Sequence, residues 1–331
     1  MENNIKSKPL VEAALMAAIT FILMMLTTFP IFDAIGVFLI PIPIALLYLR
    51  HSKKVAWLST IVSGILLGVF YSPFAGIQSI IVYGLMGITL GYCIKNNKSP
   101  VKTLVFLIGV NAFGSILQLT LGLAVFSKIS LNDFLQQVVD TFQEVINTIS
   151  SMGINNPAAE QVLEIYKAID VNFLMMILPL ILISQIIIGA FLNVTIAKSI
   201  LKKLGYKMES LPPFSTWYLD TRFGAVLILI CCIATILKVK NVPYGDTAFF
   251  TAYYMLLFAF VIQGLSVVSY FLKNKLKLTN GFIVLIEVMI MLSSLVMFVF
   301  ILGLSDLIMD IRGVDPNSLG TYIRSKIKAN G

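Results

Sequence analysis

The sequence predicts an all-α polytopic membrane protein, a transmembrane helical bundle of about nine spans. Of its 331 residues, 58% are hydrophobic and only 12% are charged, and the mean hydropathy is +0.94. A soluble globular chain carries roughly 25% charged residues, so this chain has too few polar groups to cover a water-facing surface. The composition therefore excludes a soluble enzyme, a secreted domain and a disordered protein.

The apolar residues fall in long runs, and a helix needs about 20 of them to cross the hydrocarbon core of a bilayer. Nine runs are candidate spans: Leu10–Pro30, Asp33–Leu49, Val55–Tyr71, Gly76–Ile94, Thr103–Phe126, Val171–Ala197, Gly224–Leu237, Phe249–Leu272 and Gly281–Leu304. The second, third and seventh runs are short, and the seventh is the weakest candidate for a span. Pro41 and Pro43 predict that the second run is kinked or partly unwound. The backbone polar groups freed by such a break must be buried in protein or face a cavity.

The basic residues predict the orientation. With the N-terminus in the cytoplasm, inner segments hold twice as many Lys and Arg residues as outer ones, as the positive-inside rule requires. This distribution accounts for the net charge of +8 without nucleic-acid binding. One misfit remains, because nine spans put the basic tail with Arg324, Lys326 and Lys328 outside. Eight or ten spans would return the tail to the cytoplasm.

The segment 128–170 is the one sizeable polar loop, and it carries apolar residues at helical spacing. Ser130 is a candidate N-cap with Asp133 in the first turn, and Gly153 is a candidate stop. A second helix would begin with Asn156 and Pro157. The spacing predicts an amphipathic helical hairpin on the outer face. Two interpretations stay open: a hairpin that lies on the membrane surface or the span ends, and a lid over an outward-facing cavity.

Small residues at a spacing of four mark close helix packing in lipid. Ala13, Ala14, Ala17 and Ala18 form two overlapping pairs of this kind at the start of the first span. Gly64 with Gly68, and Gly87 with Gly91, repeat the pattern. Packing within the bundle explains the glycines. The alanines lie at the entry of the first helix, where a partner protein could also reach them.

The opening Leu10-Val-Glu-Ala-Ala-Leu-Met-Ala-Ala-Ile resembles the first helix of S-components, the substrate-binding subunits of energy-coupling-factor transporters. The short helix Ile40-Pro-Ile-Pro-Ile-Ala and the run Tyr83-Gly-Leu-Met-Gly-Ile-Thr-Leu-Gly fit the same pattern. The resemblance covers roughly the first 200 residues. It implies that Ala13, Ala14, Ala17 and Ala18 dock a transmembrane coupling subunit that works with two ATPases. S-components normally end after six helices, whereas this chain continues.

The whole chain more closely resembles the YybS-like family of uncharacterised bacterial membrane proteins. In that family an S-component-like half precedes a Pro-x-Phe-x-x-Trp segment, which matches Pro212, Phe214 and Trp217 here. The resemblance implies three parts: an S-component-like domain of six spans over residues 1–205, a cytoplasmic connector over 206–222, and a domain of about three spans over 223–331.

Polar residues at membrane depth are candidate functional residues, because each is costly to bury. Glu287 is the one ionisable side chain well inside a predicted span, and Gln263 on the preceding span could satisfy it. Asp306 and Asp310 most simply form a solvated helix end. In the first half, a ligand site near the outer face would draw on polar groups of the fourth to sixth spans: Gln78, Tyr83, Asn111, Gln118 and Gln185. The alternative for each is an ordinary interhelical hydrogen bond.

The sequence carries no recognisable catalytic signature. The sequence has no phosphate-binding loop, no GxSxG elbow and no HExxH helix, and its single histidine and three cysteines predict neither a metal site nor a disulfide framework. We therefore expect a protein that is not an enzyme and has no cofactor, in the bacterial cell membrane with its N-terminus inside. The leading hypothesis is binding or transport of a small molecule. The alternatives are a membrane scaffold or regulator that recruits other proteins, and a Glu287-dependent proton-coupled carrier.

Overall fold

The computed structural model describes residues 3–29, 32, 36, 38–151, 169–206, 208–315 and 318–330. Every regular element in these ranges is a helix, which confirms the all-α fold. The chain divides into two compact units, and each is described by itself. Unit 1 comprises Met1–Val171 and Ile181–Leu211, and unit 2 comprises Asn172–Leu180 and Pro212–Gly331.

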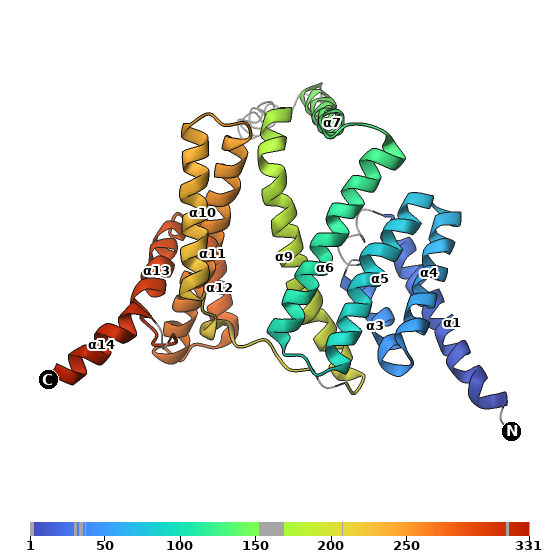
Figure 1. Cartoon of the computed structure of the whole chain (residues 1–331), viewed down its shortest axis with the longest axis horizontal. Helices are drawn as coiled ribbons and strands as arrows, with labels where there is room; N and C mark the ends of the chain where they lie inside the picture. Colours follow the sequence, from blue (N-terminus) through green and yellow to red (C-terminus); the bar gives the residue numbers. More distant parts are fainter. Residues whose placement is uncertain are drawn as a thin grey trace. The chain divides into compact units, whose positions relative to one another are not determined.

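Unit 1 is a helical bundle with an amphipathic helix across one end (Figure 1). Its elements are α1 (Asn3–Leu26), α3 (Pro41–Arg50), α4 (Lys53–Phe70), α5 (Pro73–Lys95), α6 (Pro100–Leu121), the π-helical turn η1 (Gly122–Ser127), α7 (Leu131–Ser151) and the greater part of α9 (Val171–Lys203). Serines begin three of them, because Ser52, Ser72 and Ser99 accept hydrogen bonds from backbone N–H groups three residues later. Each cap satisfies a donor that the helix itself leaves unpaired.

Glycines bring the helices of unit 1 close together, as their spacing predicts. A Cβ at Gly76 of α5 would overlap the Gly64 carbonyl oxygen of α4 and lie 2.9 Å from the Gly68 Cα. A Cβ at Gly87 would lie 2.6 Å from the Ile44 Cβ of α3. The contacts explain how α3, with only ten residues, is held in the bundle. Van der Waals contact of this kind drives helix association in lipid.

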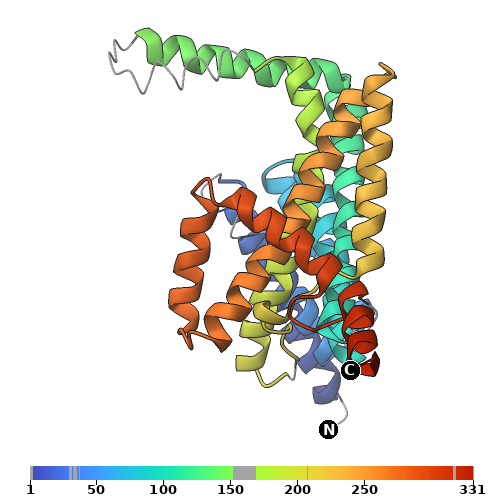
Figure 2. The same cartoon turned by 90° about the vertical axis from the view of Figure 1, so that its left-hand side faces the viewer.

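The predicted second span is partly corrected. Pro41 begins α3 instead of kinking it, since proline at the first helical position removes no intrahelical hydrogen bond. Residues 33–35 and 37, which belong to the same predicted span, lie outside the described residues. Of the predicted hairpin, the first helix is confirmed: it is the amphipathic α7, which runs sideways at one end of unit 1 (Figure 2). Gly153, Asn156 and Pro157 also lie outside the described residues.

Unit 2 is built on a pair of antiparallel helices. It contains a short 3-10 turn, η2 (Phe214–Thr216), followed by α10 (Thr221–Val239), α11 (Gly245–Asn274), α12 (Asn280–Met291), α13 (Val296–Met309) and α14 (Leu319–Asn330). A tight turn at residues 240–244 joins α10 to α11. The seventh predicted span is sound, because α10 has 19 residues and is apolar enough to cross a membrane.

The ninth predicted span is wrong as a single helix. It is the pair α12 and α13, which are bent by 111° at the intervening residues. Both ends of the pair lie at one end of unit 2. α12 follows the end of α11, while after α13 the carboxylate of Asp315 accepts a hydrogen bond at 3.0 Å from the Thr221 hydroxyl, at the start of α10. The pair therefore has the geometry of a re-entrant hairpin (Figure 2).

The bent pair brings the basic tail back to the end of unit 2 at which the connector lies, as the expected orientation requires. The chain that follows α13, with the basic helix α14, emerges at the end of unit 2 where α10 begins. This is also the end of the connector that contains Pro212 and Trp217. Within the described residues, six helices are long and apolar enough to cross a membrane, and α1 and α3 are shorter apolar helices. The polytopic bundle is thus confirmed, with eight apolar helices plus the bent pair.

Candidate functional site

A cavity of about 280 Å³ opens in unit 1 beneath α7. Its walls come from α5, α6, η1, α7 and α9, and the described lining residues are Phe74, Ser115, Gln118, Leu119, Gly122, Leu123, Ser127, Phe134, Leu182 and Gln185. Gln118 and Gln185, which lie far apart in the sequence, are brought to one cavity. The two amides offer hydrogen-bond donors and acceptors to the same space.

The π-helical turn η1 shapes the cavity wall. It widens the end of α6 until Lys128 adopts a left-handed conformation at φ 54° and ends the helix. The centroids of the Phe74 and Phe126 rings lie 4.8 Å apart, and a Cβ at Gly122 would meet the Phe74 ring at 3.1 Å. Such π-helical turns are rare and occur frequently at functional sites.

The start of α7 is fixed next to the cavity by a reciprocal cap, as the sequence predicts. The Ser130 hydroxyl donates to the Asp133 carboxylate at 2.7 Å, and the Asp133 backbone N–H donates to the Ser130 hydroxyl at 3.2 Å. The Ser130 backbone N–H also donates to the Asp133 carboxylate, at 3.1 Å, and the bonds that this carboxylate accepts from Ser130 lower the pKa of Asp133. The cap positions the next residue, Phe134, which lines the cavity. α7 buries Leu135, Val139 and Ile146 along one side. Among the described residues, only the first turn of α7 therefore contributes to the cavity wall, through Phe134.

The other predicted ligand residues of unit 1 are not among the described residues that line this cavity. The Asn111 side-chain amide donates to the Ile186 carbonyl of α9 at 3.1 Å and is buried. This is an ordinary interhelical hydrogen bond, which is the alternative to a ligand contact that the sequence left open. Tyr83 is buried among Met24, Ile44 and other apolar residues, and Gln78 is half-buried on α5.

The four alanines of α1 divide between two environments. Ala17 is buried, and its carbonyl accepts a hydrogen bond at 2.8 Å from the Ser63 hydroxyl of α4. Ala13 is half-buried, whereas Ala14 and Ala18 are exposed. One stripe of the small-residue face therefore packs within unit 1, and the other stripe is open.

A second polar site, missed by sequence reasoning, lies in unit 2. The side chains of Asp306 and Arg312 are both fully buried and form an ion pair at 3.0 Å. Gln263 of α11 donates to the same Asp306 oxygen at 2.6 Å and accepts from the Leu219 backbone N–H at 2.8 Å. Gln263 thus joins α11 both to Asp306 at the end of α13 and to the connector.

The guanidinium of Arg312 also holds the connector directly. It donates to the carbonyl oxygens of Ser215 at 3.0 Å and Trp217 at 2.7 Å, and to the Ser266 hydroxyl at 2.6 Å. The Ser266 hydroxyl in turn donates to the Phe214 carbonyl at 2.7 Å. The Pro-x-Phe-x-x-Trp segment is therefore bound onto α11 by backbone carbonyls that accept bonds from one buried cation and one hydroxyl.

The interpretation of Asp306 and Asp310 as a solvated helix end is wrong. Both are fully buried. Asp310 accepts hydrogen bonds from the Val314 backbone N–H at 2.8 Å and the Ser318 hydroxyl at 3.2 Å, which organises the turn after α13. The sequence did carry a signal, namely a charged and glycine-containing segment, Asp310-Ile-Arg-Gly, directly after an apolar run. No spacing in it, however, indicates that the segment folds back against Gln263 and Ser266.

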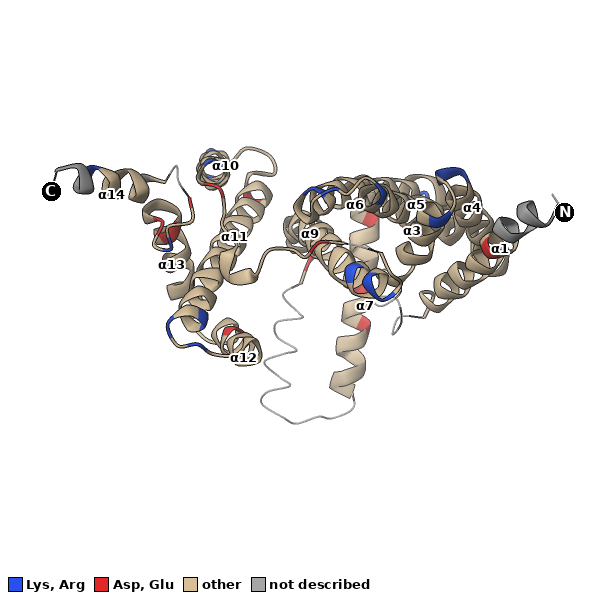
Figure 3. Ribbon diagram, turned by 90° about the horizontal axis from the view of Figure 1, so that it is seen from below, with Lys and Arg blue, Asp and Glu red and all other residues tan. Residues whose placement is uncertain are grey.

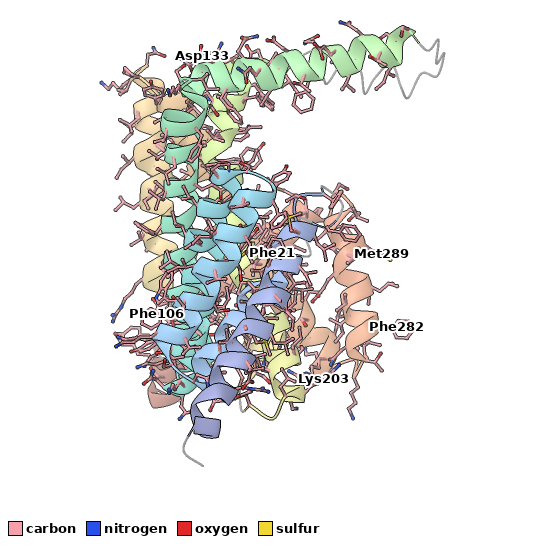
Figure 4. The ribbon with its side chains drawn as sticks, turned by 90° about the vertical axis from the view of Figure 1, so that its right-hand side faces the viewer. Phe21, Phe106, Asp133, Lys203, Phe282 and Met289 are labelled. Carbon is pink, nitrogen blue, oxygen red and sulfur yellow. The ribbon has the colours of Figure 1, made fainter. Side chains whose placement is uncertain are left out.

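The predicted contact between Glu287 and Gln263 is also wrong. The Gln263 amide is engaged by Asp306 and the connector, while the Glu287 carboxyl contacts Ser269 of α11. Its Oε1 atom is buried and makes no hydrogen bond to any residue that the structure describes. Phe282 and Met289, on the same helix, are exposed and point outward (Figure 4).

No group of three or more His, Cys, Asp or Glu side chains within the described ranges is arranged to hold a metal ion. The cavity of unit 1 and the polar cluster of unit 2 differ in chemistry. The cavity of unit 1 is neutral and open, and the cluster of unit 2 is charged, buried and almost fully hydrogen-bonded.

These features define a multi-pass membrane protein with a helical cavity-bearing unit and a smaller unit that contains a re-entrant hairpin. The chain belongs to the family described as predicted membrane protein (DUF2232), whose profile matches residues 18–307. It is similar to the Uncharacterized protein YybS of Bacillus subtilis (strain 168), with 20% identity over 280 residues, 82% of this chain and 86% of that protein. The YybS-like assignment is thereby confirmed, while the S-component resemblance stays a prediction. No solved structure matches the chain.

Proposed function

We propose that unit 1 binds a small, uncharged molecule in the cavity beneath α7 and takes part in its transport across the membrane. The observation that carries this proposal is the convergence of Gln118 and Gln185 on one cavity. The described lining contains no charged side chain, and it combines amides, hydroxyl groups and phenyl rings. Ligand sites typically combine a mostly apolar wall with a few polar groups in this way. A volume of about 280 Å³ suits a small ligand.

Replacing both glutamines tests the cavity. Gln118→Leu combined with Gln185→Leu keeps the side-chain size but removes four hydrogen-bonding atoms, and each lost bond to a ligand costs about 1 kcal/mol. We expect affinity to fall about tenfold or more. The measurement is thermal stabilisation of the purified protein by a library of small neutral metabolites. Gln137→Leu, at an exposed position on α7, is the matched control. Stabilisation of the double variant equal to that of the control would contradict the proposal.

The S-component resemblance extends the proposal to a partner. Ala14 and Ala18 form the open stripe of α1, so a coupling subunit with two ATPases would dock there. Ala14→Leu inserts an isobutyl group into that contact, and we expect the partner to be lost while unit 1 stays folded, since Ala14 contacts no core cluster. Quantitative mass spectrometry after affinity purification from native membranes measures this. Ala225→Leu, exposed on α10, is the control. Equal recovery of partners with both variants would sink the docking idea, and recovery of unrelated membrane proteins would favour a scaffold.

Glu287 supports a second candidate function, a proton-coupled carrier. A carboxyl group on a re-entrant helix, with one oxygen buried and without a hydrogen bond among the described residues, resembles the ionisable residues of proton pathways. Glu287→Gln keeps the shape and removes the titration. Under this function, proteoliposomes with the variant should lose pH-driven flux although the protein still inserts. Glu144→Gln, exposed on α7, should retain it, and retained flux in Glu287→Gln would exclude the mechanism.

A further inference from the structure

A second and larger cavity, of about 550 Å³, lies at the opposite end of unit 1. Its walls are the turn between α5 and α6, the last turn of α9 and the chain that follows α9. Figure 4 places Asp133, near the first cavity, and Lys203, beside the second, at opposite ends of the unit. The described lining contains the polar residues Asn97, Lys98, Thr103, Lys202, Tyr206 and Glu209.

Two tightly closed helix ends shape this cavity. α5 ends where Asn97 takes a left-handed conformation at φ 48°, and the Lys98 backbone N–H donates to the Cys93 carbonyl at 2.9 Å. α9 ends in the same way at Gly205, φ 87°, where the Tyr206 backbone N–H donates to the Leu201 carbonyl at 3.0 Å. These bonds satisfy carbonyl groups that helices leave unpaired at their C-termini. Since the turns are fixed, Lys98 and Lys202 stand on two defined edges of one cavity.

The charge of the cavity is positive. Two lysines line it against one carboxylate, Glu209, and neither Lys98 nor Lys202 forms an ion pair with a described residue. The same helices carry further lysines towards these ends, namely Lys95 on α5, Lys102 on α6, and Lys198 and Lys203 on α9. Figure 3 shows Lys and Arg in blue at this end of α5, α6 and α9. The acidic Glu12, by contrast, is already paired with Arg50 and His51.

We propose that this cavity binds a phosphate group between Lys98 and Lys202. Two ammonium groups supply the charge, while the Asn97 amide and the Tyr206 hydroxyl can donate to further phosphate oxygens. Ile94 and Met208 give the cavity an apolar wall, which suits a phosphate carried on an organic body. The cavity lies at the ends of membrane-length helices, where basic pockets meet the headgroups of anionic lipids. The same chemistry would accept the phosphate of a soluble metabolite.

The test uses the full-length, delipidated protein in detergent and measures binding by native mass spectrometry and thermal stabilisation. The probes are dioleoyl phosphatidylglycerol, dioleoyl phosphatidylcholine and glycerol 3-phosphate. The decisive variant is Lys98→Gln combined with Lys202→Gln. Its control is Lys53→Gln combined with Lys54→Gln, a pair that is exposed at the start of α4 and lines no part of the cavity. Each lysine near a membrane surface contributes to the free energy of binding an anionic headgroup. The loss of two lysines should therefore weaken binding about 10- to 30-fold.

The outcomes separate the two sources of phosphate. Preferential binding of phosphatidylglycerol over phosphatidylcholine, lost in the Lys98/Lys202 variant alone, supports a lipid headgroup. Binding of glycerol 3-phosphate with the same loss supports a soluble ligand. Binding of neither anionic probe, or an equal loss in the Lys53/Lys54 control, would overturn the proposal. None of these results depends on the neutral cavity beneath α7.

Discussion

Arg312→Met is expected to destabilise unit 2 more than any other single side-chain change there. Methionine fills a similar volume but donates no hydrogen bond, so Asp306 is left as a buried charge without its cation. Breaking a buried ion pair by removing one partner costs about 3–5 kcal/mol. The carbonyl oxygens of Ser215 and Trp217 lose their donor in the same step. We expect the connector to detach from α11.

The measurement is thermal unfolding of the purified protein in mild detergent, with limited proteolysis to detect release of the connector. Arg222→Met is the matched control, because Arg222 is exposed at the start of α10. Adding Asp306→Asn to Arg312→Met removes the stranded charge and should recover part of the lost stability. An unfolding temperature for Arg312→Met equal to that of the control would mean that the buried pair does not hold unit 2 together.

Gly303→Leu is expected to separate α13 from α11. The two helices cross in backbone contact: a Cβ at Gly303 would overlap the Phe260 carbonyl oxygen, and a Cβ at Gly264 would overlap the Val299 carbonyl oxygen. No side-chain rotation relieves such an overlap, so the helices must move apart. Overpacking of a core costs about 1–3 kcal/mol, and a clash with backbone belongs at the upper end of that range.

Thermal unfolding in detergent tests this prediction as well. Gly109→Leu is a matched control in the middle of α6, where a Cβ would meet no atom within 4 Å. Leucine there should leave stability unchanged or raise it slightly, because glycine is a poor helix former. If Gly303→Leu and Gly109→Leu unfolded at the same temperature, the close crossing of α11 and α13 would be refuted.

Much of the fold could be predicted from the sequence, because the bilayer imposes a simple rule on it. Long apolar runs become helices, and serines and prolines at their starts mark where they begin, as at Ser72 and Ser99. The re-entrant hairpin could not be predicted in this way. The run Gly281–Leu304 has the length and composition of a span, and nothing in its hydropathy reveals that Ser293 and its neighbours turn the chain back. That bend depends on how α13 packs on α11.

The candidate sites were less predictable, for a related reason. The sequence marks Gln118 and Gln185 as polar residues at membrane depth. Only tertiary packing brings these two to one cavity and engages Asn111 in a hydrogen bond with α9. Arg312 was overlooked because it follows a span instead of lying within it. A charge just beyond an apolar run is usually solvated. Arg312 is buried here because Asp306 pairs with it and because further partners, 46 to 97 residues away in the sequence, accept its other hydrogen bonds.

Native mass spectrometry of the full-length protein, extracted from cells that produce it, is the direct test of ligand capture in the cavity beneath α7. We expect the protein to carry a small, uncharged molecule as an added mass. That mass should be absent from the Gln118→Leu, Gln185→Leu variant and present in the Lys98→Gln, Lys202→Gln variant. A protein with no added mass in a metabolite-rich extract, or one that keeps the same mass after both glutamines are replaced, would contradict ligand capture beneath α7.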